Sequence, residues 1–67
     1  MPELTVNGEK RTVAAGATVA DLLTQLGVKA RFLVVERNGE PIARDAFAAT
    51  ALAEGDRLEI VSPVGGG

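Results

Sequence analysis

One short segment, residues 18–27, carries a complete set of signals for a single amphipathic helix. Thr18 is a good N-cap, Asp21 stands three residues later as its capping-box partner, and Gly27 supplies a left-handed stop. Between these ends, four apolar residues recur at helical spacing and line one face: Val19, Leu22, Leu23 and Leu26. This face must pack on another element, and the rest of the chain offers a sheet.

The chain is expected to open with a β-hairpin. Leu4 and Val6 alternate with polar residues and lead into Asn7-Gly8, the dipeptide that most strongly favours a type I′ turn. The segment from Arg11 to Val13 follows the turn as the second strand. Two further turns are predicted, at Asn38-Gly39 and at Glu54-Gly55-Asp56.

The second half of the chain predicts two more strands and a short helical turn. The unbroken apolar run at 32–35 is typical of a central strand covered on both faces or shielded by partner contacts. Residues 58–62 alternate as a last strand, and Leu52 is interpreted as a minor edge strand. The Ala-rich stretch 44–49 is too brief for an independent helix and predicts one helical turn that carries Phe47 into the core.

These elements fit one small domain, because a chain of 67 residues cannot support two cores. A mixed sheet that grips one main helix buries the helix face most simply and places the first and last strands side by side near the middle. The predicted fold is therefore α+β, the β-grasp arrangement of ubiquitin. We expect a domain over 1–62 and a flexible C-terminal tail over 63–67.

The composition removes many classes of function. The chain has no Cys and no His, so it lacks a thiol nucleophile, an imidazole base and the usual zinc ligands. A net charge of −2 gives no electrostatic footprint for nucleic acid or an anionic membrane, and no apolar run is long enough to span a bilayer. The carboxylates are interpreted as a solvated surface, since a glycosidase-like acid pair would need a cleft. We expect a cytoplasmic protein with no bound cofactor and no metal.

The chain end is then the most plausible reactive position. Gly65, Gly66 and Gly67 close the sequence, and glycine can follow a narrow path without Cβ clashes. Five extended residues over 63–67 reach ~17 Å, enough to enter another protein's active site. The terminal carboxylate is a poor electrophile at neutral pH and needs activation, for which adenylation by ATP is the usual solution. The chain would be the substrate, and its partner would supply the catalytic residues.

Several segments resemble, in order, those of the ThiS family of ubiquitin-like sulfur carriers of thiamine biosynthesis. They are Leu4-Thr5-Val6-Asn7-Gly8, Thr18-Val19-Ala20-Asp21-Leu22-Leu23, Val35-Glu36-Arg37-Asn38-Gly39, Gly55-Asp56 and Val64-Gly65-Gly66-Gly67. The resemblance implies that an E1-like enzyme of the ThiF type adenylates Gly67 with ATP. It also implies that a sulfur donor, such as a cysteine desulfurase, converts Gly67 to a thiocarboxylate. A thiazole synthase of the ThiG type would take the sulfur, with Gly66 a required neighbour and Gly65 extending the pair.

Two other classes of function stay open at this point: the same sulfur chemistry in another pathway, and a role without sulfur. The same chemistry could serve molybdopterin synthesis or tRNA thiolation, or the chain could be a ubiquitin-like modifier or a plain interaction module. For docking, we expect exposed apolar residues beside the tail, Val61 and Val64, to meet the partners, although both could equally pad the core or an edge.

Overall fold

The computed structural model describes residues 1–29 and 33–61. Its elements are β1 (Glu3–Val6), β2 (Glu9–Thr12), α1 (Val19–Leu26), β3 (Val34–Arg37), β4 (Glu40–Ile42), the 3₁₀ helix η2 (Arg44–Ala49) and β5 (Arg57–Val61). Two of the predictions, Phe32 in the third strand and the end of the last strand at Ser62, lie outside the described residues.

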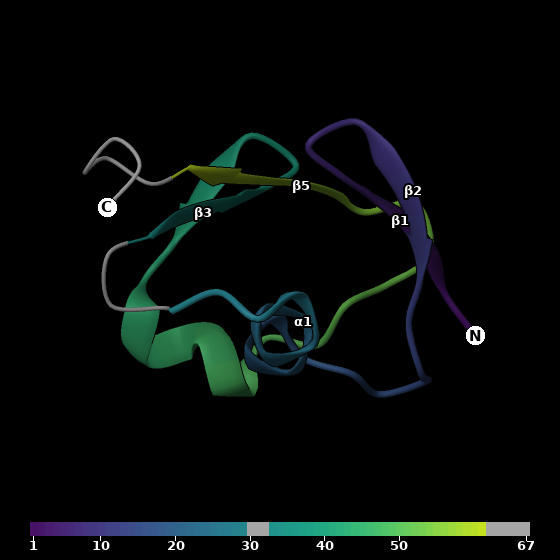
Figure 1. Cartoon of the computed structure of the whole chain (residues 1–67), viewed down its shortest axis with the longest axis horizontal. Helices are drawn as coiled ribbons and strands as arrows, with labels where there is room; N and C mark the ends of the chain where they lie inside the picture. The colour runs from purple at the N-terminus through teal and green to yellow at the C-terminus, as the bar shows by residue number, and fades with distance from the viewer. Residues whose placement is uncertain (30–32, 62–67) are drawn as a thin grey trace.

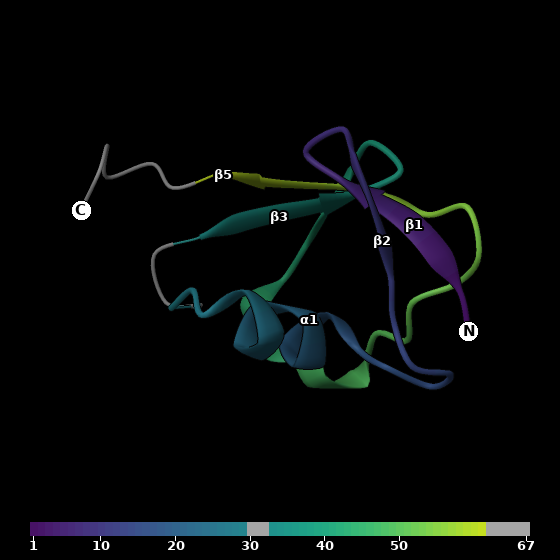
Figure 2. The same cartoon turned by 45° about the vertical axis from the view of Figure 1, so that its right-hand side comes forward.

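Five strands form one mixed sheet in the order β2-β1-β5-β3-β4. β1 runs parallel to β5, whereas β1 with β2, β3 with β4 and β3 with β5 are antiparallel pairs. The first and last strands therefore lie side by side in the middle, as predicted. Figures 1 and 2 show α1 and η2 together on one side of the sheet, so the predicted grip of a mixed sheet on one main helix is confirmed.

The helix begins and ends where its sequence signals place it. Thr18 Oγ1 accepts a hydrogen bond from the Asp21 N–H at 3.2 Å, and an Asp21 carboxylate oxygen accepts one from the Thr18 N–H at 2.9 Å. This reciprocal pair is a capping box, which satisfies two backbone donors that helix geometry leaves unpaired. Gly27 then closes the helix with a φ of 74°, a conformation that costs a residue with a Cβ about 1–2 kcal/mol.

The core lies between the sheet and the two helical elements. Its buried apolar residues are Leu4, Val6, Val13, Val19, Leu22, Leu23, Val35, Phe47, Leu52 and Leu58. η2 places Phe47 in this core, which confirms the short helical turn predicted for that stretch. Only one aromatic ring contributes to this set, so branched aliphatic side chains provide most of the buried apolar area.

Two strand predictions are wrong in part. Leu52 belongs to no strand: the bridge beside it joins Ala51 to Thr18, and the Leu52 side chain is buried in the core. The edge strand next to β3 is β4, which the sequence pattern missed because it is only three residues long and contains Pro41. An edge position tolerates proline, since its missing N–H need not face a neighbouring strand.

The third strand also differs from its prediction. β3 begins at Val34 and includes Glu36 and Arg37, and β5 rather than β3 occupies the centre of the sheet. Val34 is 44% exposed, so the strand is not covered on both faces within this chain. The alternative, that partner contacts shield its apolar side chains, stays a prediction.

Candidate functional site

The predicted site lies at the C-terminal end of β5. Val61 is the last residue of that strand and its side chain is 55% exposed. The predicted modified residue Gly67, its neighbours Gly66 and Gly65, and the predicted docking residue Val64 lie outside the described residues. The structure therefore describes the base of the tail, which is the end of β5 at Val61.

The sheet face beside this base carries a small apolar pair. Val34 on β3 lies directly opposite Val61 on β5, and both valines are exposed. Their strand neighbours Val35 and Ile60 form the next opposed pair, and Val35 is fully buried. Because successive side chains alternate between faces, Val34 and Val61 point away from α1. Val34 was not among the predicted docking residues, because its apolar run was interpreted as a strand covered on both faces or shielded by partner contacts.

Two glutamates continue the same face toward the middle of the sheet. Glu36 on β3 lies opposite Glu59 on β5, two residues along each strand from the valines. Like charges placed directly opposite each other across a strand pair are destabilising. The outer face near the end of β5 thus combines two exposed valines with a repelling carboxylate pair; we name Val34, Glu36, Glu59 and Val61 the outer patch.

Two asparagines hold the ends of β5. Both occupy the left-handed region, Asn7 at a φ of 51° and Asn38 at 54°, each as the first residue of an Asn-Gly turn. The Asn38 backbone N–H donates to the Arg57 carbonyl at 2.8 Å, and Asn38 Oδ1 accepts from the Arg57 N–H at 2.8 Å. Asn7 Oδ1 accepts from the Ile60 N–H at 2.8 Å, and Asn7 Nδ2 donates to the Ile60 carbonyl at 3.2 Å. The sequence signalled both turns, but it contained no signal for these side-chain contacts.

The start of β5 is fixed by the one buried charged residue of the described chain, Asp56. One carboxylate oxygen accepts from the Ala53 N–H at 2.8 Å and the other from Asn38 Nδ2 at 3.1 Å. Arg37 Nη1 lies 3.7 Å from the same carboxylate and donates to the Ala51 carbonyl at 3.0 Å. Asp56 was interpreted as a turn residue, and it also links that turn to the β3–β4 hairpin.

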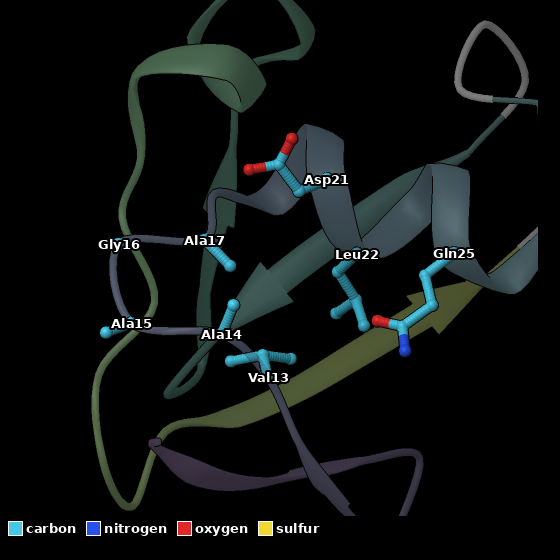
Figure 3. A pocket seen from close by; sticks show the side chains of 8 residues that line it. All are labelled: Val13, Ala14, Ala15, Gly16, Ala17, Asp21, Leu22 and Gln25. Carbon is cyan, nitrogen blue, oxygen red and sulfur yellow. The ribbon is translucent and has the colours of Figure 1, made fainter.

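One hollow of the described surface lies beside the N-terminal end of α1. Figure 3 shows this hollow, of about 270 Å³, where the alanine-rich loop after β2 meets α1. Its one ionisable lining group, Asp21, is already engaged by the helix cap. Within the described ranges, no three Asp or Glu side chains gather as a metal site, and no helix is long and apolar enough to cross a membrane. The hollow carries no chemistry that competes with the chain end.

One helix held by a five-stranded mixed sheet, with the last strand parallel to the first at its centre, defines a β-grasp protein of the ubiquitin-like class. The model of the ThiS family matches residues 4–67, which is nearly the whole chain. The chain belongs to the ThiS family.

Solved structures and curated relatives agree with this membership. A crystal structure of the thiamine biosynthesis protein ThiS from Geobacter metallireducens shares 44% identity, covers 97% of this chain and 99% of that one, and superposes with a TM-score of 0.83. The sulfur carrier protein ThiS of Bacillus subtilis is 38% identical over 50 residues, which are 75% of this chain and 76% of that protein.

Two longer relatives match the chain as well. A thiazole synthase of Paramagnetospirillum magneticum is 46% identical over 65 residues, which are 97% of this chain and 20% of the synthase. One of Magnetococcus marinus is 39% identical over 62 residues, which are 92% of this chain and 19% of the synthase. The chain thus spans about a fifth of the length of these two curated relatives.

Proposed function

We propose that this chain is a sulfur carrier of thiamine biosynthesis and that the α-carboxyl group of Gly67 bears the sulfur. The observation that carries the proposal is the family match, which runs through the glycine triplet to residue 67. A relative named as a sulfur carrier, 38% identical over three quarters of this chain, supports the assignment of the cargo. In this role residues 1–62 are the folded body and residues 63–67 are the tail that enters the partner.

The chemistry takes place at one carbonyl group. An oxygen of the Gly67 carboxylate attacks the α-phosphorus of ATP, pyrophosphate leaves, and a mixed anhydride with AMP forms. Hydrosulfide from the donor then attacks the carbonyl carbon, the bond to the AMP oxygen breaks and AMP departs, which leaves a thiocarboxylate at the chain end. If the donor delivers the sulfur as a persulfide, the product is an acyl disulfide, and a thiol reductant must cleave its S–S bond to release the thiocarboxylate. The chain acts as a co-substrate: the E1-like enzyme supplies the catalytic groups, and Gly66 and Gly65 leave the carbonyl open to attack.

The recipient of the sulfur is a thiazole synthase. The two longer relatives named thiazole synthase support this partner, because each contains a segment similar to nearly all of this chain. The outer patch and Val64 are the proposed docking surface. Exposed apolar side chains mark interaction sites, and contacts made beside the tail would hold it close to the partner. A cytoplasmic location follows from the supply of ATP that adenylation requires.

A genetic experiment tests the pathway. A strain that lacks the gene is expected to need thiamine for growth, and the thiazole precursor or the wild-type gene is expected to restore growth. A gene that lacks the Gly67 codon is the matched control and is expected not to restore growth. Growth of the deletion strain without any supplement, or a requirement relieved by a molybdopterin precursor instead, would contradict the proposal.

A biochemical experiment tests the chemistry. The purified carrier must first show the intact mass of a chain that ends at Gly67, because the carboxylate has to be free. Incubation with ATP, the adenylating enzyme and a sulfur donor is then expected to raise that mass by the replacement of one oxygen by sulfur. An unchanged mass in the presence of an active adenylating enzyme refutes the carrier role.

A further inference from the structure

The end of β5 is bound differently on its two sides. On the side of β3, ordinary antiparallel pairing continues to the last residue of the strand, where Val61 lies opposite Val34. On the side of β1, the paired residues end at Val6 and Leu58, because the chain turns at Asn7. Ile60 is therefore two residues past the last strand pair on this side.

The side chain of Asn7 replaces the missing part of the parallel ladder. Its backbone N–H still donates to the Leu58 carbonyl at 2.9 Å, as a strand residue would. In a continuing parallel ladder, the Ile60 N–H would next donate to the carbonyl of residue 7. Here it donates instead to Asn7 Oδ1 at 2.8 Å, and Asn7 Nδ2 donates to the Ile60 carbonyl at 3.2 Å. One side-chain amide thus supplies both the acceptor and the donor that a continuing strand would offer to Ile60.

We propose that Asn7 is a positioning residue for the modification of Gly67, because its amide fixes the strand end from which the tail continues. This inference rests on the proposed sulfur-carrier function. Six residues, 62–67, follow Val61 in the sequence, and in extended form they span ~20 Å. Within the described chain, Asn7 makes the hydrogen bonds nearest the end of β5 on the hairpin side.

Loss of the Asn7 amide is expected to make binding of the carrier less favourable, because more of the chain must become ordered when it docks. Without the Asn7 amide, the backbone from Glu59 to Val61 is paired with β3 alone, while the Ile60 side chain still packs against the core. Docking must then order this backbone segment further. This loss of entropy occurs when the carrier binds, before the Gly67 carboxylate reaches ATP. We therefore expect the KM for the carrier to rise while kcat, which describes the seated tail, stays close to that of the wild type.

The other Asn-Gly turn provides a matched control. Asn38 has nearly the same φ as Asn7, and it also makes two side-chain hydrogen bonds at an end of β5, to the Arg57 N–H and to Asp56. Glycine adopts a positive φ without strain, so Asn7→Gly and Asn38→Gly keep the turn and remove the side-chain bonds. Both variants gain the same backbone freedom, so this effect cancels when they are compared. The two variants differ in which end of β5 they loosen.

The test measures ATP–pyrophosphate exchange by the adenylating enzyme at increasing carrier concentration, well below the melting temperature of each variant. Asn7→Gly is expected to raise the carrier KM by about three- to tenfold with kcat within about twofold of the wild type. Asn38→Gly is expected to leave both values unchanged. Equal KM values for the two variants would overturn the positioning role.

Amide hydrogen exchange provides a readout that needs no partner. The Ile60 N–H is expected to exchange faster in Asn7→Gly than in the wild type, while in Asn38→Gly it keeps its protection and the Arg57 N–H loses it. Unchanged protection of Ile60 in Asn7→Gly overturns the inference and leaves the sulfur-carrier function standing. The proposed function is refuted if the wild-type chain supports no pyrophosphate exchange with an adenylating enzyme that is active on the carrier from its own organism. This conclusion does not depend on the protection of the Ile60 N–H.

Discussion

Replacement of Asp56 by alanine is expected to destabilise the fold more than any other removal of a single charge. Asp56 is 8% exposed and accepts two hydrogen bonds, from the Ala53 N–H at 2.8 Å and from Asn38 Nδ2 at 3.1 Å. A hydrogen bond to a charged group contributes about 1.5–3 kcal/mol, and the lower end applies here because both donors belong to exposed residues. The ion pair with Arg37 at 3.7 Å adds at most about 0.5 kcal/mol, since that guanidinium is 38% exposed.

These contributions give a loss of about 3–3.5 kcal/mol in the free energy of unfolding for Asp56→Ala. A domain of this size has a total stability of roughly 3–10 kcal/mol. Each kcal/mol lost lowers its melting temperature by about 4–8 °C, so the melting temperature is expected to fall by about 12–28 °C. Asp56→Asn retains one acceptor oxygen. Its NH₂ group replaces the other oxygen, so that contact places two hydrogen-bond donors opposite each other. Its loss is expected to lie between those of wild type and Asp56→Ala.

The assay is urea unfolding followed by far-UV circular dichroism. The control is Glu59→Gln, because Glu59 is an exposed carboxylate on β5 that accepts no hydrogen bond from the described residues. An Asp56→Ala variant within about 0.5 kcal/mol of the wild type would show that solvent replaces both bonds and would refute the reasoning. A double substitution with Asn38→Gly should lose less than the sum of the single losses, because the two side chains share one hydrogen bond.

Three other predictions concern the tail, the outer patch and the helix cap. Deletion of Gly67, or Gly66→Phe, is expected to abolish sulfur loading in the mass assay and leave the melting temperature unchanged; a large fall would make the tail structural. Glu59→Gln is expected to raise stability by a few tenths of a kcal/mol at low salt, because it removes the repulsion with Glu36, and a gain that persists in 1 M salt would exclude that cause. Thr18→Ala is expected to cost about 1 kcal/mol in urea unfolding through loss of the cap, and no loss would show that water replaces its hydroxyl.

Local signals predicted most of the fold. Thr18, Asp21 and Gly27 act within one or two helical turns, so their sequence spacing alone defined the helix. The Asn-Gly dipeptides marked both hairpin turns for the same reason, because the left-handed conformation is a property of the residue itself. The order of these elements then left few ways to bury one helix face.

Contacts between distant residues were beyond such signals. Leu52 is buried in the core without belonging to a strand, and its N–H donates at 2.9 Å to the carbonyl of Ala17, which lies 35 residues earlier. The amide of Asn7 reaches Ile60 across 53 residues, and nothing in the Asn-Gly pattern distinguishes that use from a plain turn. The exposure of Val34 depends on which face of the sheet α1 covers. An unbroken apolar run does not indicate which of its side chains point toward the helix.

The most direct test of the sulfur-carrier function is a fragment-ion mass spectrum of the carrier after incubation with ATP, the adenylating enzyme and a sulfur donor. The function predicts that the added sulfur resides only in C-terminal fragments and, among these, at Gly67. Sulfur at any other residue, or a carrier that forms the adenylate and then gains no sulfur from any donor, would contradict it.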